Sequence, residues 1–234
     1  MHSWCNLKYL QEHLQFYTQP IVDLQSKQTV GYEMLARLNV GDKVLSPHQF
    51  LSVLESEGLY PDLDEILGEV VVSFLSVISD NQFVSINIPS VDSLMFHVNN
   101  PKYKNICHRV HLELLESVEW SFSEQLLLIE WASKRGFEVY LDDFGSGFSN
   151  IKTLTSPYLS GVKIDRTMFN EFFESDLKVP FSKLLVFLKS MGNKLVLEGV
   201  ETAEQTRFLT DLDSEMFCQG FLYGKPESIE CKLR

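Results

Sequence analysis

Short apolar runs alternate with longer, helix-like stretches along almost the whole chain. Eight of the apolar runs have the length and character of β-strands. The stretches between the later runs are long enough for helices, and this alternation predicts α/β units around a mainly parallel sheet. The predicted strands cover residues 16–23, 30–38, 83–87, 110–114, 139–142, 162–165, 195–198 and 217–221.

The first two predicted strands are separated only by the short segment 24–29. They are therefore expected to form a hairpin, in which the first strand runs antiparallel to its neighbour. Eight strands in a domain of 234 residues favour a closed barrel. An open, doubly wound sheet is the alternative, although the first turn lacks the GxGxxG loop of dinucleotide-binding domains.

Two pairs of residues have the spacing of a capping box, in which two side chains satisfy each other's exposed backbone donors. They are Ser121 with Glu124, and Thr202 with Gln205. Each pair predicts the start of a helix. The segment 61–79 is long and apolar enough to form a further helix that packs on the sheet.

The composition indicates one globular domain over residues 1–234, with residues 1–15 as a helical N-terminal extension. Hydrophobic residues make up 44% of the chain, enough for a core that needs no disulfides. The four cysteines form no CxxC pair, which is typical of reduced thiols in a cytoplasmic protein. Because no signal peptide or spanning apolar stretch is evident, we expect a cytoplasmic location and no membrane partner.

The formal net charge of −12 limits the possible ligands. General nucleic-acid binding relies on Lys and Arg that neutralise phosphates, so we expect none here. An anionic membrane surface is disfavoured for the same reason. If the ligand carries phosphate, divalent metal ions are the natural means of offsetting the acids around it.

Polar side chains gather at the ends of the predicted strands, and a barrel brings the C-terminal ends of its strands to one face, where active sites lie. Taken singly, each has an ordinary explanation: a lone Glu or Lys is usually exposed, Asn87 suits a turn, and Asp142 with Asp143 suits a helix N-cap. Together, converging carboxylates repel one another unless Mg²⁺ or Mn²⁺ lies between them. The side chains at or near strand ends are Asn87, Glu113, Asp142, Asp143, Lys163, Glu198 and Gln219, and Glu33 joins them from inside the second predicted strand.

Adjacent aspartates also suit a two-metal site. One carboxylate can bridge two ions about 4 Å apart while its neighbour holds the second ion. Spacing alone therefore predicts a metal-dependent phosphohydrolase.

The motifs around these residues resemble the EAL domain family of cyclic di-GMP phosphodiesterases. The similarity extends from Phe16 to Pro226, and the motifs follow the order of the family. They are QPIVDL from Gln19, GYEMLAR with Glu33 and Arg37, SIN ending at Asn87, LELLES with Glu113, DDFGSGF from Asp142, VKID with Lys163, EGVE from Glu198 and QGFLYGKP from Gln219.

The resemblance implies a modified TIM-type (β/α)8 barrel with one antiparallel strand, and a site for two Mg²⁺ or Mn²⁺ ions. One ion would be held by Glu33, Asn87, Glu113 and Asp142, and the other by Asp142, Asp143 and Glu198. Catalytic roles would fall to Glu33, Lys163, Glu201 and Gln219, with Lys163 orienting the attacking water or the phosphate. Substrate contacts would come from Gln19, Arg37, Asp165 and Pro226, and support for a mobile loop from Glu116, Gly145 and Gly147.

The activity that the resemblance implies is hydrolysis of cyclic di-GMP to linear pGpG by a stand-alone, homodimeric EAL domain. Calcium is expected to inhibit, because a larger and less demanding ion distorts a two-metal geometry. Two departures favour a different hypothesis: Met34 stands where the family has Ala, and Leu115 replaces a Thr and so removes a hydroxyl. That hypothesis is an EAL fold that binds cyclic di-GMP or a partner protein without turnover. An unrelated metal-dependent barrel hydrolase is the third possibility.

Overall fold

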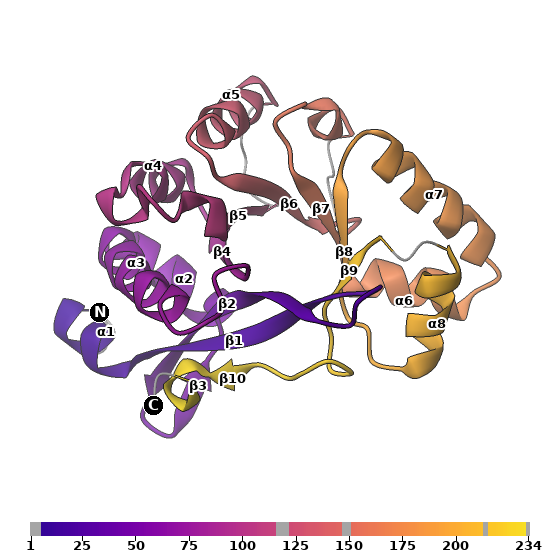
Figure 1. The fold of residues 1–234 in the computed structure, drawn as a ribbon. Coiled ribbons are helices and arrows are strands. Elements are labelled where there is room, and N and C mark those ends of the chain that lie inside the picture. Colours follow the sequence, from indigo (N-terminus) through magenta and orange to yellow (C-terminus); the bar gives the residue numbers. More distant parts are fainter. Residues whose placement is uncertain (1–5, 116–121, 147–150, 213–214, 233–234) are drawn as a thin grey trace.

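The computed structural model describes residues 6–115, 122–146, 151–212 and 215–232. Within them, ten strands form one sheet that closes on itself through the pairing of β1 with β2 (Figure 1). The eight barrel strands are β1 (Leu14–Asp23), β2 (Thr29–Val40), β4 (Phe83–Ile88), β5 (Val110–Leu115), β6 (Glu138–Phe144), β7 (Gly161–Ile164), β8 (Lys194–Leu197) and β9 (Phe217–Cys218). The short strands β3 (Lys43–Leu45) and β10 (Glu227–Ser228) extend the sheet beside β2 and β1.

The directions of the strands confirm the predicted fold class. Strand β1 is antiparallel to both of its barrel neighbours, β2 and β9. The pairings from β2 through β4 and on to β9 are all parallel. The fold is therefore an α/β structure of the (β/α)8 barrel type with one antiparallel strand. The open-sheet alternative is wrong, because the β1–β2 pairing closes the sheet.

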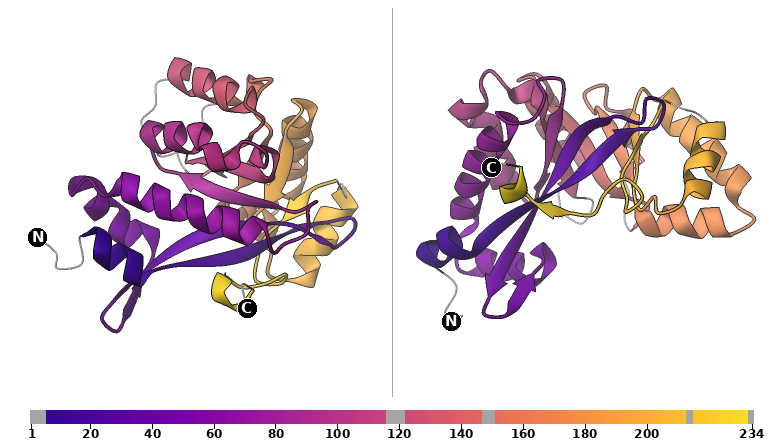
Figure 2. Two further views of the ribbon diagram at one scale, coloured as in Figure 1. Left: turned by 60° about the vertical axis from the view of Figure 1, so that its left-hand side comes forward. Right: turned by 60° about the horizontal axis from the view of Figure 1, so that its bottom comes forward.

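Helices surround the barrel (Figures 1 and 2). They are α1 (Leu7–His13), α2 (Pro47–Ser56), α3 (Tyr60–Leu75), α4 (Val91–Asn99), α5 (Phe122–Ser133), α6 (Arg166–Glu174), α7 (Lys178–Ser190) and α8 (Ala203–Leu212), with 3-10 turns η1 (Pro101–Tyr103), η2 (Cys107–Arg109), η3 (Thr153–Thr155) and η4 (Ile229–Cys231). None of the helices within the described ranges combines the length and apolar character needed to cross a membrane.

Two of the predicted helix signals are confirmed. The segment 61–79 contains most of α3. At the start of α8, the Gln205 backbone N–H donates to Thr202 Oγ1, and the Thr202 N–H donates to Gln205 Oε1, which is the expected capping box. Ser121 of the other predicted capping box lies outside the described residues.

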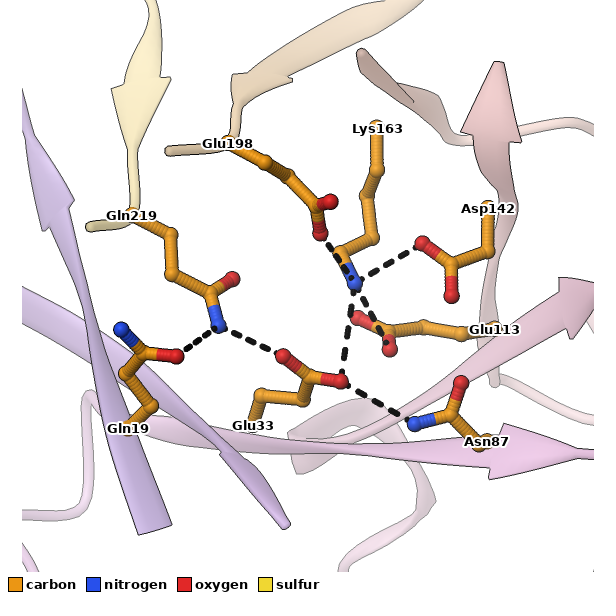
Figure 3. A network of polar contacts seen from close by, with 8 residues as sticks. All are labelled: Gln19, Glu33, Asn87, Glu113, Asp142, Lys163, Glu198 and Gln219. Atoms are coloured by element: carbon orange, nitrogen blue, oxygen red, sulfur yellow. Dashed lines mark hydrogen bonds and ion pairs between the residues drawn. The ribbon is translucent and has the colours of Figure 1, made fainter. Parts of the chain in front are cut away.

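The two faces of the strands serve two different cores, because successive side chains of a strand point to opposite sides. Along β4, Val84, Ile86 and Ile88 are fully buried in the main core between the sheet and the helices. Phe83 belongs to a separate cluster inside the barrel, and Asn87 on the same face of the strand points into the barrel mouth (Figure 3). Each fully buried aliphatic side chain of this kind contributes roughly 1.5–3 kcal/mol to folding.

Two large rings fit into the barrel interior because the strand beside each of them carries a glycine. A Cβ atom on Gly31 would lie 2.4 Å from Cε2 of Phe83, and one on Gly161 would lie 2.5 Å from Cε1 of Tyr140. Any side chain at these glycines would therefore collide with the rings. The alternation of small and large residues makes the interior a packed core instead of a pore.

A cluster of polar residues occupies the floor of the barrel, near the N-terminal ends of the parallel strands. We call His111, Glu138, Tyr140 and Lys194 the floor cluster. The His111 ring stacks between Phe83 (centroids 3.7 Å apart) and Tyr140 (5.3 Å). Glu138 accepts a hydrogen bond from the Tyr140 hydroxyl (3.1 Å) and pairs with Lys194 (2.7 Å). Burial lowers the pKa of His111 to about 4, although Glu138 opposes this shift.

Candidate active site

The mouth of the barrel receives one polar side chain from each barrel strand (Figure 3). Four of the side chains come from the C-terminal halves of the parallel strands β4 to β7, and Glu198 and Gln219 directly follow β8 and β9. The two longest strands contribute from their middles: Gln19 on the antiparallel β1 pairs with Glu33 on β2. The eight residues are Gln19, Glu33, Asn87, Glu113, Asp142, Lys163, Glu198 and Gln219.

The Lys163 ammonium lies at the centre of this group and is 1% exposed. Its Nζ atom is within ion-pair distance of four carboxylates: 2.8 Å from Glu198, 2.9 Å from Asp142, 3.0 Å from Glu113 and 3.8 Å from Glu33. Burial alone disfavours the charged form, but the carboxylates outweigh it and raise the pKa of Lys163 well above its usual value.

The acids outnumber the single buried ammonium. Burial raises the pKa of Glu113 well above its usual range; Lys163 opposes the shift, and Glu33 and Asp142 add to it. Burial likewise raises the pKa of Glu198 to about 8, against the opposing effect of Lys163. One lysine therefore does not neutralise the mouth, and more positive charge would be accommodated there.

Amide side chains hold the carboxylate of Glu33 from two sides. Asn87 Nδ2 donates to Glu33 Oε1 (3.0 Å), and Gln219 Nε2 donates to Glu33 Oε2 (2.5 Å). Gln219 Nε2 also donates to Gln19 Oε1 (3.1 Å), and Gln19 in turn donates to the Gly224 carbonyl (3.1 Å). This network fixes the orientation of the Glu33 carboxylate, which is 8% exposed.

An irregularity in β6 brings two adjacent aspartates to the mouth. The pairing of β6 with β7 shifts register between Leu141 and Phe144, with one extra residue on β6. Such a bulge breaks the alternation of side chains and re-aims one of them. Asp143 sits at the bulge with φ +54°, an unusual conformation for a residue other than glycine. As a result Asp142 and Asp143 both line the cavity.

The oxygen atoms at the mouth fit a hard divalent cation. Asp142, Asp143 and Glu198 each offer an oxygen, and these atoms lie within 4.8 Å of one another. Gln219 Oε1 is buried without a donor among the described residues, and Asp142 Oδ1 faces the Lys163 ammonium without an aligned hydrogen bond. Oxygen ligands in this arrangement suit Mg²⁺ or Mn²⁺.

Other residues singled out in the sequence lie farther from this centre. Glu201 and Arg37 line the cavity, and Glu201 pairs with Arg166 (2.7 Å). Pro226 also lines the cavity. Asp165 is not among the described lining residues; its carboxylate accepts backbone N–H groups of Thr167 and Met168 and so caps α6.

The predicted loop residues are only partly described. Gly145 has φ +98°, and a Cβ there would lie 2.1 Å from Sδ of Met168, so only glycine fits. Glu116 and Gly147 lie outside the described residues. Of the two departures from the family pattern, Met34 is 3% exposed within the core and Leu115 lines the cavity.

A cavity of about 490 Å³ extends from the mouth to a wall formed by β2, α2 and α3. Three ionisable residues of its lining were not predicted from the sequence: Asp64 on α3, His48 on α2, and Arg166 at the start of α6. Asp64 carried a signal that could have been used, because it is an acid within an otherwise apolar helix face and is only 6% exposed.

The fold and the site together define a (β/α)8 barrel with an acidic, oxygen-rich mouth. The chain belongs to the EAL domain family, whose family model matches residues 6–226. It is 30% identical to the bifunctional diguanylate cyclase/cyclic di-GMP phosphodiesterase MucR of Pseudomonas aeruginosa over 93% of this chain. The chain spans only 33% of the length of that relative.

Solved structures share the fold. A structure of the PaMucR phosphodiesterase in complex with c-di-GMP has a TM-score of 0.80 and 28% identity, and the match covers 94% of each chain. Klebsiella pneumoniae BlrP1 in a manganese/cyclic di-GMP complex has a TM-score of 0.77 and 22% identity, over 92% of this chain and 56% of BlrP1. A calcium/cyclic di-GMP complex of BlrP1 matches similarly, with a TM-score of 0.78 and 21% identity over 97% of this chain and 58% of BlrP1.

Proposed function

We propose that this chain is a metal-dependent phosphodiesterase that hydrolyses one phosphodiester bond of cyclic di-GMP and releases linear pGpG. The observation that carries the proposal is the convergence of polar side chains from all eight barrel strands around Lys163 at one mouth. The name of the MucR relative and the c-di-GMP complex of the PaMucR structure support this choice of substrate.

Two overlapping sets of side chains would hold the metal ions: Glu33, Asn87, Glu113 and Asp142 for one, and Asp142, Asp143 and Glu198 for the other. Bound divalent ions would supply a nucleophilic water at neutral pH and neutralise charge on the reacting phosphate. Magnesium or manganese is our proposal for the ion, with calcium inhibitory. Turnover in Mg²⁺ or Mn²⁺ that falls when Ca²⁺ is added would support this; full activity in Ca²⁺ alone would contradict it.

Residues of the mouth orient the reacting groups. Lys163, held by its surrounding carboxylates, would donate to the attacking water or to a phosphate oxygen, and Gln219 would position the water beside Glu33. The water oxygen forms a bond to phosphorus while the bond from phosphorus to the ribose 3′-oxygen breaks. The water loses a proton and the departing 3′-oxygen gains one. Glu201 would support this arrangement through its partner Arg166.

The cavity offers separate places for the phosphates and bases of the substrate. The planar Arg37 guanidinium would bind a phosphate, and Gln19 and Pro226 would contact the nucleotide. At the far wall, the Asp64 carboxylate would accept hydrogen bonds from the N1–H and N2–H groups of a guanine base. Asp165 stays a predicted substrate contact, although its described hydrogen bonds cap a helix.

A second candidate is a cyclic di-GMP receptor or interaction module without turnover. Leu115 favours it, because an apolar side chain lines the cavity where the family carries a hydroxyl. Incubation of the purified protein with cyclic di-GMP and Mg²⁺ or Mn²⁺ separates the two. Appearance of pGpG that is abolished by Glu33→Ala, but not by the exposed control Glu171→Ala, supports the enzyme. Tight binding without pGpG supports the receptor.

We further propose that the protein forms a homodimer. Helix α7 exposes Val179 (63%) and Val186 (65%), and large exposed apolar side chains of this kind commonly mark contacts between proteins. Light scattering coupled to size-exclusion chromatography would give the mass directly. A monomer at micromolar concentration would contradict the proposal without affecting the proposed activity.

A further inference from the structure

A buried polar network lies behind the far wall of the cavity, between α3 and α4. The Asp64 Oδ1 atom accepts a hydrogen bond from the Ser93 hydroxyl (2.8 Å) and lies 3.2 Å from His97 Nε2. Ser93 and His97 are four residues apart on α4 and therefore share one face of that helix. Both are fully buried or nearly so, with exposures of 1% and 0%.

A third residue continues the network. The Tyr103 hydroxyl is 3.4 Å from His97 Nδ1, and the two rings are nearly parallel, with centroids 5.9 Å apart. A hydroxyl that donates to Nδ1 leaves the ring proton on Nε2, which then donates to Asp64. Gly68, one turn after Asp64, makes room for this packing, because a Cβ there would lie 2.9 Å from Asn100 Nδ2 and 3.7 Å from the Tyr103 hydroxyl.

Both contacts to Asp64 use the same oxygen. No hydrogen bond within the described residues uses Oδ2, although Asp64 lines the cavity that also contains Glu33 and Lys163. A carboxylate held through one oxygen is fixed in rotation and can present the other to a ligand. The polar network therefore has a geometry that a purely structural buried pair does not require.

We propose that Ser93 and His97 are positioning residues that hold Asp64 as a rigid acceptor for the donor edge of a guanine base; this inference rests on the proposed function. Guanine presents N1–H and N2–H side by side, and the available Oδ2 atom of Asp64 can accept hydrogen bonds from this edge. Adenine presents an acceptor at N1, which an aspartate oxygen repels. The network therefore sets the preference for cyclic di-GMP over cyclic di-AMP.

The test compares His97→Leu with His97→Gln by steady-state kinetics. His97→Leu removes the donor to Asp64, and we expect KM for cyclic di-GMP to rise about tenfold or more, in line with a lost hydrogen bond to a charged group. The value of kcat should change less, because the reacting atoms lie at the other end of the cavity. His97→Gln keeps an N–H donor and should restore most of the loss.

Base preference separates a positioning role from a purely structural one, because a loss of stability alone would not change it. The inhibition constant of cyclic di-AMP is measured in competition with cyclic di-GMP. The ratio of this constant to KM for cyclic di-GMP should be lower in Asp64→Asn and His97→Leu than in the unmodified protein. The matched control is His111→Leu, which removes another buried histidine from the floor cluster. That variant should lose stability but keep the base preference of the unmodified protein.

The possible results are distinct. Folded His97→Leu with an unchanged KM and unchanged base preference overturns the inference and leaves the proposed function intact. If His97→Leu does not fold, Ser93→Ala and Tyr103→Phe are measured in the same way, and unchanged values in both overturn it. If the unmodified protein neither binds nor hydrolyses cyclic di-GMP, the proposed function fails and the inference falls with it.

Discussion

The barrel holds polar groups at both ends, and they differ in how completely they are satisfied. In the floor cluster, Glu138 has Lys194 and the Tyr140 hydroxyl as partners, and His111 is stacked between two rings. At the mouth, four carboxylates share the Lys163 ammonium. Buried polar groups with balanced partners stabilise a fold, whereas a buried excess of one charge is typical of a functional site.

The two ends should also respond to pH in opposite directions. The pKa of His111 is lowered from 6.5 to about 4, so the unfolded chain takes up a proton before the folded one does, and stability falls as the pH drops through this window. The pKa of Glu198 is raised from 4.5 to about 8, so the folded, metal-free protein holds a proton that the unfolded chain has lost. Stability at the mouth therefore falls as the pH rises from 4.5 to 8.

The largest expected effect is on activity and comes from removing a carboxylate of the mouth. Glu113→Gln should lower kcat for cyclic di-GMP by about a thousandfold, a loss typical of removing one preorganised electrostatic group. The metal-free variant should nevertheless be at least as stable as the unmodified protein, since one repulsive charge is gone. Product formation and urea unfolding in EDTA would measure both. A variant that is inactive because it is unfolded would refute this contrast.

Removal of the ammonium should have the opposite effect on stability. Lys163→Met leaves several buried acids without their cation, and the free energy of unfolding in EDTA should fall by about 3–5 kcal/mol. The acids would take up protons in response, so the loss should be smaller at pH 5 than at pH 8. Denaturant titration at the two pH values tests this. Equal stability of variant and unmodified protein at pH 8 would show that Lys163 does not hold the mouth together.

At the floor, the test is the slope of stability against pH. Replacing His111 with Phe keeps a ring between Phe83 and Tyr140 but removes the titrating group. The unmodified protein should lose up to about 3 kcal/mol between pH 6.5 and pH 4 through this histidine, and His111→Phe should lose correspondingly less. Parallel curves for the two proteins would mean that His111 is not responsible.

The smallest effect is expected at the edge of the floor cluster. The Lys194 side chain is about half exposed, at 49%, so its pair with Glu138 is screened by water. Lys194→Met should cost about 1 kcal/mol or less. If Lys194→Met lowered the free energy of unfolding as much as Lys163→Met does, the two ends of the barrel would not differ in how strongly they depend on their lysine.

Most of the fold was predictable because strands such as β5 and β7 are buried on both faces, and their sequences are therefore short, mainly apolar runs. Strands β3 and β10 were missed because three or two residues are too few to show a period. The mouth was predictable from Glu113, Asp142 and Lys163, since residues that end parallel strands must meet at one face.

The remaining parts of the site depend on geometry that the sequence pattern does not encode. The bulge that turns Asp143 inward appears only in the pairing of β6 with β7. Asp64 and His97 belong to different helices, and their contact follows from how α3 and α4 pack. Asp165 shows the opposite case, in which a residue chosen for its motif has backbone N–H groups as its hydrogen-bond partners.

The antiparallel strand has a consequence for how the protein is made. Strand β1 is synthesised well before β9, its partner on the other side, where Val22 pairs with Cys218. The ring cannot be completed until nearly 200 further residues have been synthesised, and such distant pairing slows folding. Until then β1 and β8 each lack the neighbour that β9 provides, and an unpaired strand edge of this kind can pair with another chain.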